Sequence, residues 1–328
     1  MRHLVILCAL QLLVACSDPF TGFPESDGDA GGDVANDGGA GGSGAGVVTS
    51  AGGFTTNVGG GGSGTSGGVG GGNTCTPSAQ ICSGDTLLTC DGVNYVFDTD
   101  CTVGDGLCLA SRCEFGITAL LRFTEGSGTV TSGESPSMLQ GLHTGTWMSG
   151  FDGGNAVSFD GNSEVDFGGA LDSLGLPFSV SAWVNIPPGS NTTMTVLATN
   201  TIINGDYAGI WLDVDAANGN TVVLAFGNGA GVGPANRHAK RSSSSVPQGV
   251  WTHVTGVFTA PDVASIYIDG VDAGGSYSGT ATFVGNTGAP MFVGRAFWTP
   301  SPFIGGIDDI RIYNRALSPV EAFELSQL

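Results

Sequence analysis

An all-β fold is predicted for the C-terminal two-thirds of this chain of 328 residues, with two antiparallel sheets packed as a sandwich or jelly roll. From residue 117 onward, short segments of alternating apolar and polar residues are separated by Gly, Asn, Asp and Pro, and no helical period lies between them. A cysteine-rich stretch precedes these segments, and a glycine-rich stretch precedes the cysteines. The composition predicts four regions: a signal peptide (1–15), a disordered tether (16–74), a disulfide module (75–115) and the sandwich (117–328).

The first residues predict an export signal. Met1–His3 is a short basic start, and Leu4–Val14 is almost wholly apolar. This apolar run is too short for a permanent membrane span, which needs about 20 residues. The signal ends in Leu13–Cys16, which resembles the bacterial lipobox, and the resemblance implies that Cys16 carries the lipid. Ser17, rather than Asp, after the cysteine implies retention at the outer membrane, with the protein held at the cell surface. An ordinary signal peptide is the alternative.

The tether and the overall charge limit the partners of this chain. Residues 17–74 are mostly Gly, Ser, Ala, Thr and Asp and contain no Lys or Arg. Such a segment cannot bury enough apolar surface to offset its ordering entropy, so it is expected to stay disordered and to hold the folded part away from the membrane. The formal net charge of -20 disfavours binding to nucleic acid or to anionic lipid. The predicted lipid anchor is therefore the expected link to the membrane.

Six cysteines within a segment too short to form a hydrophobic core predict three disulfides behind the export signal. They are Cys75, Cys82, Cys90, Cys101, Cys108 and Cys113. Zinc is a weaker explanation, because residues 75–113 contain no CxxC pair and no histidine. Fifteen pairings are conceivable. We favour Cys75–Cys90, Cys82–Cys101 and Cys108–Cys113.

The strands of the sandwich are predicted from two-residue alternation. In Phe178–Ile186, apolar residues alternate with Ser, Trp and Asn, which gives the strand one apolar face. Similar runs are Ile117–Phe123, Ala156–Phe159, Gly209–Val214, Val222–Phe226, Val254–Phe258 and Ile310–Tyr313. Asp160-Gly161 and Asp269-Gly270 suit the positive φ angles of tight hairpins.

One short helix is predicted at the C-terminus. Ser318–Glu321 supplies an N-cap serine, a proline at the first helical position and a glutamate three residues after the cap. Ala322, Phe323 and Leu325 are expected to dock on the sheet.

Five sequence blocks, in order along the chain, resemble those of the laminin-G-like (concanavalin A-like) jelly-roll family of bacterial extracellular proteins. The blocks are Phe123–Thr129, Gly154–Gly161, Phe178–Val184, Trp251–Gly270 and Gly305–Ser318. The resemblance implies a jelly-roll fold with Trp183 and Trp251 in its core. The chain departs from the family at residues 130–135, where relatives often carry Asp-Ser-Ser-Gly, so a metal site that uses that aspartate is in doubt.

Catalysis is not expected, although the fold family includes glycosidases. Sandwich glucanases need two carboxylates, usually Glu, at a fixed distance on one strand face, and none of the glutamates of residues 117–328 is paired in this way. Asp213 and Asp215 do alternate onto one face, but they lack a Glu partner. His253 is expected to be a packed residue. No nucleophile elbow, zinc-binding helix or phosphate loop is present in the sequence.

A non-catalytic binding domain for carbohydrate or protein ligands is the leading prediction. Sugar recognition combines an exposed aromatic face with polar groups. The candidates are Phe297 and Trp298 in the loop Ala296–Phe303, followed by Asp206 and Tyr207. Alternatively, Trp298 caps one end of the sandwich. The expected partner is an extracellular glycan or a surface protein. A structural envelope lipoprotein is the alternative, and a polysaccharide hydrolase comes third.

No cofactor is expected, and structural calcium stays an open alternative. Clustered carboxylates bind hard cations, and Asp160, Asp166, Asp308 and Asp309 are the candidate ligands. Asp308 and Asp309 are equally compatible with an ion pair to Arg311 at a sheet edge.

Overall fold

The computed structural model describes residues 75–103, 106–109, 111–134, 139–169, 171, 174–199, 206–285, 290–295 and 301–328. The predicted signal peptide, Cys16 and the predicted tether lie outside these residues. Within them, no helix is long and apolar enough to cross a bilayer.

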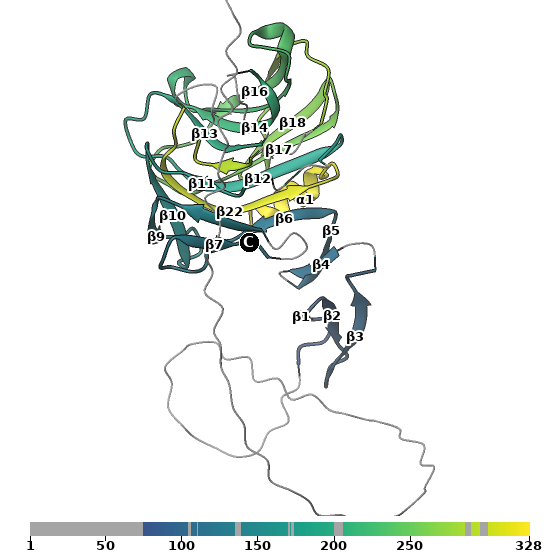
Figure 1. Cartoon of the computed structure of the whole chain (residues 1–328). Helices are drawn as coiled ribbons and strands as arrows, with labels where there is room; N and C mark the ends of the chain where they lie inside the picture. Colours follow the sequence, from purple (N-terminus) through teal and green to yellow (C-terminus); the bar gives the residue numbers. More distant parts are fainter. Residues whose placement is uncertain are drawn as a thin grey trace, which may run out of the picture. The chain divides into compact units, whose positions relative to one another are not determined.

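Two large antiparallel sheets form the sandwich (Figure 1). The first has eight strands in the order β19-β18-β17-β12-β22-β10-β9, and β6 also pairs with β22. Its strands are β6 (Ile117–Leu121), β9 (Thr146–Ser149), β10 (Asn155–Asp160), β12 (Phe178–Asn185), β17 (Thr252–Ala260), β18 (Val263–Ile268), β19 (Val271–Asp272) and β22 (Ile304–Tyr313).

The second sheet has nine strands in the order β20-β16-β15-β14-β13-β21-β11-β8-β7. Its strands are β7 (Val130–Ser132), β8 (Gln140–His143), β11 (Val165–Asp166), β13 (Thr193–Ala198), β14 (Ala208–Asp215), β15 (Thr221–Asn228), β16 (Arg237–Ser245), β20 (Ser276–Gly279) and β21 (Phe292–Val293). Two short 3-10 helices, Ala216–Asn218 and Pro234–Asn236, lie in its loops.

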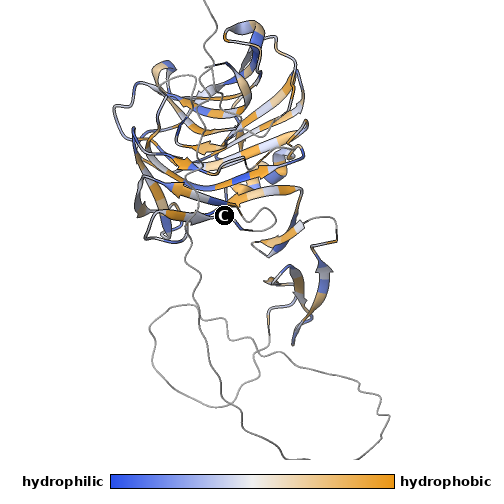
Figure 2. Ribbon diagram, viewed as in Figure 1, coloured by the Kyte–Doolittle hydropathy of each residue, from blue (hydrophilic) through white to orange (hydrophobic). Residues whose placement is uncertain are grey.

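The main core lies between the two sheets, where apolar residues of alternate strand positions meet. Figure 2 shows hydrophobic and hydrophilic positions mixed along the strands of the sandwich. On β12, Phe178, Val180, Ala182 and Val184 are fully buried, which confirms the predicted apolar face. Ser179 on the opposite face of β12 is buried as well, because its hydroxyl donates to the carbonyl of Arg315 and accepts from the N–H of Leu317. The eight-stranded sheet is therefore covered on both faces in this region.

The predicted C-terminal helix is confirmed as α1 (Pro319–Leu325). Ser318 caps it through the N–H of Glu321, and the Glu321 carboxylate returns a bond to the N–H of Ser318. Ala322 and Leu325 are buried one helical turn apart, as expected. Phe323 is 50% exposed and does not dock, because it lies about 100° around the helix from its buried neighbour.

The two predicted hairpin turns have different outcomes. Asp269 and Gly270 connect β18 to β19 with φ angles of 48° and 74°, which confirms a two-residue turn. The hairpin predicted at Asp160-Gly161 is wrong, because β10 and β11 belong to different sheets and the chain crosses between them at this point. A short Asp-Gly turn fits both routes, so local sequence could not separate them.

The cysteine-rich region forms two small sheets. One has the order β1-β2-β3, and the other is the hairpin β4-β5. The strands are β1 (Gln80–Ser83), β2 (Thr86–Cys90), β3 (Tyr95–Asp100), β4 (Gly106–Leu109) and β5 (Arg112–Phe115).

All six cysteines are paired, but two of the three predicted disulfides are wrong. Cys75–Cys90 forms as predicted, whereas the others are Cys82–Cys108 and Cys101–Cys113. Cys108 and Cys113 face each other across the hairpin, yet each is bonded to a cysteine from the preceding part of the module. Two disulfides thus fasten the hairpin to the three-stranded sheet, which a local Cys108–Cys113 bond would not do.

The β4-β5 hairpin also packs on the eight-stranded sheet. Leu107 and Leu109 of β4 share a buried cluster with Ile117, Leu120 and Tyr313 on the outward face of that sheet. The hairpin and α1 therefore cover a face that would otherwise expose apolar side chains.

Candidate ligand-binding pocket

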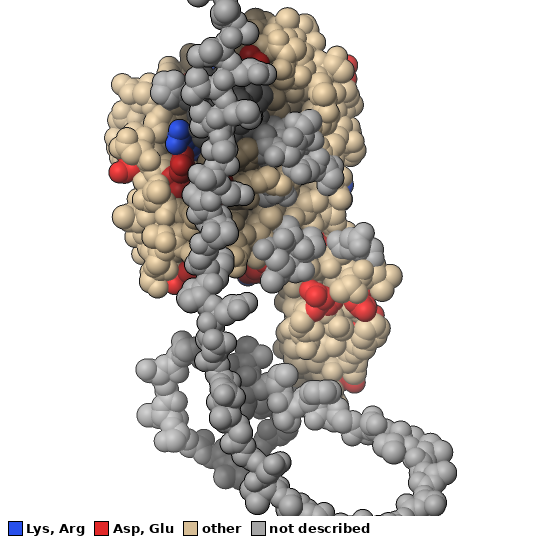
Figure 3. Space-filling view, in the orientation of Figure 1, with Lys and Arg blue, Asp and Glu red and all other residues tan. Residues whose placement is uncertain are grey.

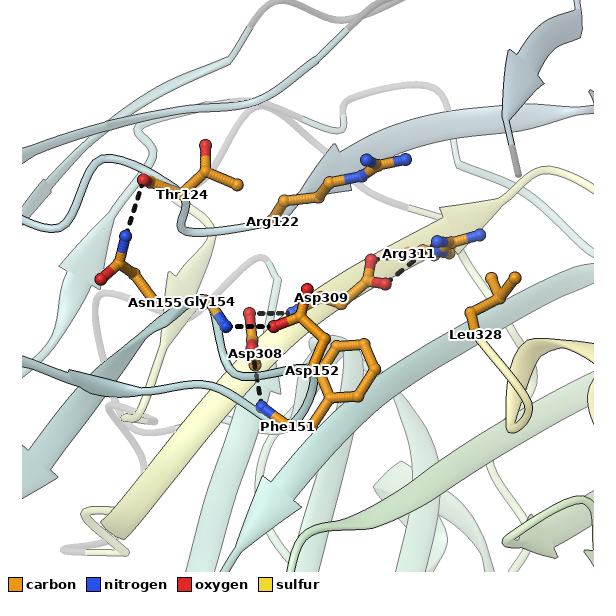
Figure 4. Close-up of a pocket in the computed structure, with 10 residues that line it drawn as sticks. All are labelled: Arg122, Thr124, Phe151, Asp152, Gly154, Asn155, Asp308, Asp309, Arg311 and Leu328. Carbon is orange, nitrogen blue, oxygen red and sulfur yellow. Dashed lines mark hydrogen bonds and ion pairs between the residues drawn. The ribbon is translucent and has the colours of Figure 1, made fainter. Parts of the chain in front are cut away.

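A polar pocket of about 260 Å³ opens on the outward face of the eight-stranded sheet (Figure 4). Three segments supply most of its lining: the chain after β6, the turn between β9 and β10, and the middle of β22. The lining residues are Arg122, Thr124, Phe151, Asp152, Gly154, Asn155, Asp308, Asp309, Arg311 and Leu328.

A β-bulge in β22 creates the charged floor of this pocket. Ser181 pairs with Arg311 and Trp183 pairs with Asp308, so β22 has one residue more than β12 between these pairs. Asp309 has a φ of 41°, a left-handed conformation that few non-glycine residues adopt. The extra residue lets Asp308, Asp309 and Arg311 all line the outward face.

Asp309 and Arg311 form a buried ion pair that extends to Glu114 of β5. The guanidinium of Arg311 lies 3.0 Å from Asp309 and 2.7 Å from Glu114, and all three side chains are less than 10% exposed. Tyr313 donates its hydroxyl to the second Glu114 oxygen at 2.8 Å. Burial alone would lower the pKa of Arg311, but the two carboxylates hold it above its ordinary range. The predicted ion pair is present, though on an interior strand instead of a sheet edge.

Asp308 anchors the turn above the floor. Its carboxyl accepts the N–H of Asp309 at 2.8 Å and that of Phe151 at 3.4 Å. A Cβ on Gly150 would collide with the same carboxyl, so a glycine is required there. Burial raises the pKa of Asp308 to about 8, and the nearby charges of Asp309 and Asp152 act in the same direction.

The aromatic wall of the pocket comes from Phe151. Its ring stacks on Trp183 with the centroids 4.3 Å apart and the planes within 6°. Trp183 also contacts His253, at 5.3 Å between centroids. His253 is buried, as expected, and burial lowers its pKa to about 3, so the imidazole is neutral. The prediction that Trp183 and Trp251 belong to the core is wrong, since both are half-buried and neither is part of the main buried cluster.

The rim carries exposed polar groups of several kinds. Asn155 donates from its amide to the carbonyl of Thr124 at 3.0 Å, and Asp152 accepts the N–H of Gly154 at 2.7 Å. Arg122 lies 3.5 Å from the carboxylate of Glu134. The pocket is thus lined by the hydroxyl of Thr124, the amide of Asn155, the carboxylate of Asp152 and the guanidinium of Arg122, together with the Phe151 ring. This combination of polar groups and an aromatic ring suits a polyhydroxylated ligand.

The family can now be stated from the sequence comparison. The concanavalin A-like lectin/glucanases superfamily (Laminin_G_3) matches residues 151–322, just over half of the chain. The chain belongs to this superfamily. The match includes the turn from Phe151 to Asn155 and the charged part of β22, so most of the pocket lies in family sequence. No curated protein matches the chain.

Solved structures of binding domains are similar to this concanavalin A-like domain. Domain 4 of an extracellular arabinanase from Geobacillus stearothermophilus, solved with arabinotriose, is 25% identical at a TM-score of 0.48, over 64% of this chain and 98% of that one. The binding domain of Paraclostridial Mosquitocidal Protein 1 is 15% identical at a TM-score of 0.50, over 64% of this chain and 52% of that one. The receptor-binding domain of botulinum neurotoxin type G is 16% identical at a TM-score of 0.45, over 65% of this chain and 51% of that one. These likenesses concern the fold.

Of the ligand-binding residues predicted from sequence, Asp206 and Tyr207 do not line the pocket of this concanavalin A-like domain. Phe297 and Trp298 lie outside the described residues. Asp206 and Tyr207 precede β14 in the nine-stranded sheet and are half-buried. There the Tyr207 ring stacks on Trp211, with centroids 5.7 Å apart, and the guanidinium of Arg237 lies 5.8 Å from its centre.

The other carboxylates considered from sequence lie elsewhere. Asp160 accepts the N–H of Asn162 and the hydroxyl of Ser163, and Asp166 accepts the N–H of Gly168. Across the parts of the chain that the structure describes, no three His, Cys, Asp or Glu side chains converge as they would around a metal ion. Structural calcium, which the sequence left open, therefore gains no ligand set there.

Asp213 and Asp215 share one face of β14, as predicted, and this face is turned away from the main core. The two carboxyls have unlike environments. Burial raises the pKa of Asp213 to about 7, and its Oδ1 atom has no hydrogen-bond partner. Asp215 keeps a pKa below its usual value despite partial burial, because Asn218, Arg241 and Thr193 all donate to it.

Sequence reasoning missed Phe151, Asp152 and Asn155. The strands β9 and β10 form a hairpin whose pairing ends at Ser149 and Asn155, so the Phe-Asp-Gly-Gly segment is its exposed turn. An aromatic residue at the start of a glycine-rich turn was the available signal. Its partner, Trp183, comes from a distant strand and could not be paired with it from sequence.

Proposed function

We propose that the chain is an exported, lipid-anchored protein whose concanavalin A-like domain binds carbohydrate at the cell surface without cleaving it. The arrangement that carries the proposal is the Phe151 ring, which stacks on Trp183 and forms the aromatic wall of a pocket with a polar rim. Aromatic rings pack against the C–H faces of sugars, while hydroxyl, amide and carboxylate groups satisfy the sugar hydroxyls.

The same proposal holds that the domain does not cleave the bound carbohydrate. Among the pocket carboxyls, Asp308 accepts two backbone N–H groups and Asp309 is bonded through both oxygens to Arg311. Glycoside hydrolysis needs one carboxyl that donates a proton and another that acts as base or nucleophile. In this pocket Asp308 and Asp309 are held by structural bonds, which favours recognition over hydrolysis.

Binding is tested with the full chain on a glycan array, followed by titration of the best ligand. Phe151→Ala and Asn155→Ala are each expected to weaken binding by about tenfold or more, because they remove stacking and hydrogen bonding. Phe323→Ala, which removes an exposed ring on α1, is the matched control and is expected to bind normally. Loss of binding in Trp298→Ala but not in Phe151→Ala would move the site to the loop predicted from sequence. A blank array would favour the structural envelope role, and reducing ends released from polysaccharide would show a hydrolase.

Export and anchoring are tested separately. The three disulfides are typical of a protein that folds in an oxidising compartment. The lipobox-like residues before Cys16 support attachment of lipid there. In bacteria fed labelled palmitate, the wild-type chain is expected to take up label and to fractionate with the outer membrane. Cys16→Ser is expected to lose both properties, and persistent labelling of this variant would contradict the anchor.

A further inference from the structure

The strand β3 exposes an unusual amount of apolar surface. Five of the 18 large, exposed hydrophobic residues among the described residues fall between Val93 and Val103. Phe97 is 67% exposed, Val96 43% and Tyr95 39%. Scattered apolar residues are normal on a protein surface, but a contiguous group marks an interaction site.

Tyr95 and Phe97 lie on one face of the three-stranded sheet, and Val96 between them points to the other face. The register places Ile81, Leu88 and Phe97 in one row across β1, β2 and β3. Leu87, the neighbour of Leu88, points to the opposite face and packs among the disulfides. Ile81, Leu88 and Phe97 belong to none of the buried clusters formed by the described residues. We call Ile81, Leu88, Tyr95 and Phe97 the β3 strip.

The polar groups of the same sheet are satisfied on the other side. Asp98 accepts from Thr89 at 2.5 Å and from Gln80 at 2.9 Å. The register shift between Leu87 and Leu88 accommodates one extra residue in β3, which allows this arrangement. The face that carries Leu87 and Asp98 is thus occupied by the disulfide cluster and by internal hydrogen bonds, while the face that carries the β3 strip is apolar and open.

The backbone of β3 is also open on one side. Within the described residues, β3 pairs with β2 and with no other strand, so its second edge presents N–H and C=O groups. Proteins usually protect such edges by charge, proline or a covering loop, because an apolar edge strand recruits another strand. An edge of this kind binds extended peptides by backbone pairing, with side-chain contacts adding specificity.

The charge of the module selects the partner. The described residues of the module, 75–115, contain Asp85, Asp91, Asp98, Asp100 and Glu114 and a single cation, Arg112, which is paired with Glu114 and Glu324. The face seen in Figure 3 shows acidic and no basic side chains on this part of the molecule. A second copy of the same acidic module, or an anionic membrane, would be repelled, whereas a cationic chain would be attracted.

We infer that β3 is a docking edge for an extended polypeptide segment in which apolar side chains alternate with Lys or Arg. The apolar side chains of that segment would pack on the β3 strip, and its cationic side chains would face the surrounding aspartates. The site is independent of the carbohydrate pocket, because it lies on a different sheet.

The full chain is titrated with a labelled peptide of about ten residues that alternates Val and Lys, and amide shifts are followed by NMR. We expect shifts on β3 and fluorescence-detected binding that weakens by about tenfold in Phe97→Ser. A Val-Glu peptide of equal length is expected to bind at least about tenfold more weakly, and added salt to weaken the Val-Lys peptide.

The controls separate a specific edge from general stickiness. Phe97 is exposed, so its replacement is expected to leave the fold intact, which the NMR spectrum checks directly. Val263→Ser, at another exposed apolar position, is expected to leave binding unchanged. Equal binding by wild type and Phe97→Ser would overturn the inference, as would no binding of the Val-Lys peptide. Concentration-dependent self-association abolished by Phe97→Ser would also overturn it, since the occupant would then be a second copy.

Discussion

Replacing Arg311 by methionine is expected to lower the free energy of unfolding by about 3–5 kcal/mol. The guanidinium is shared between Glu114 and Asp309, and the three side chains are buried together. Methionine fills much of the same space but leaves two carboxylates without a counter-charge in a poorly hydrated site. Chemical denaturation of the full chain, followed by tryptophan fluorescence, measures the loss.

Two further variants show whether the loss is electrostatic. Arg122→Met removes a guanidinium from a partly exposed pair with Glu134, and it is expected to cost no more than about 1 kcal/mol. Adding Glu114→Gln and Asp309→Asn to Arg311→Met neutralises the stranded carboxylates and is expected to recover part of the stability. A loss below about 1 kcal/mol in Arg311→Met itself would show that the cluster is not the buried network described.

Replacing Asp213 by asparagine is expected to stabilise the protein at alkaline pH. Burial raises the pKa of Asp213 from 3.8 to about 7, so the folded state holds this proton more tightly than the unfolded state. The contribution of Asp213 to stability is therefore complete below about pH 4 and is lost as the pH rises through about 7. At about 1.4 kcal/mol per pKa unit, this rise in the pKa of Asp213 corresponds to a loss of roughly 4 kcal/mol in the free energy of unfolding between acid and alkaline pH. Asp213→Asn should gain up to this amount over wild type at pH 8.5.

Asp215, two residues along the same face of β14, supplies a control of opposite sign. Its pKa is lowered in the folded state, so its contribution is present above about pH 4 and lost below it. Asp215→Asn is expected to destabilise at pH 8.5 by about 1–3 kcal/mol, because it weakens the bonds to Arg241 and Thr193. Denaturation curves of both variants and wild type at pH 4.5 and 8.5 make the comparison, and a destabilised Asp213→Asn at pH 8.5 would contradict the assigned pKa.

Much of the architecture follows from short-range signals. The two-residue alternation of Phe178–Ile186 locates β12 and its buried face, and the capping residues of Ser318–Glu321 locate α1. These features depend on backbone geometry that repeats every two or four residues, so a single segment contains the information. The turn at Asp160-Gly161 shows where the information ends, because a local turn signal does not say which sheet the next strand joins.

The candidate pocket could not be predicted from sequence either, because its residues come from segments that are far apart along the chain. Phe151 meets Trp183, and Arg311 meets Glu114, across separations of 32 and 197 residues along the chain. The two-residue alternation of β12 puts Trp183 on the face opposite the apolar side chains, whereas the family resemblance implied a core position; the structure shows the outward position.

The disulfide pairing also depends on contacts between segments that are separated along the chain. Cysteine count and export context predict that all six residues are bonded, because a segment this short cannot be held by apolar burial alone. Which cysteines meet depends on how the β4-β5 hairpin lies against the first small sheet. By itself, the sequence determined the class of fold, the strands with strong alternation and the presence of crosslinks. The tertiary structure decided the partners, because contacts between distant segments depend on the packing of whole sheets.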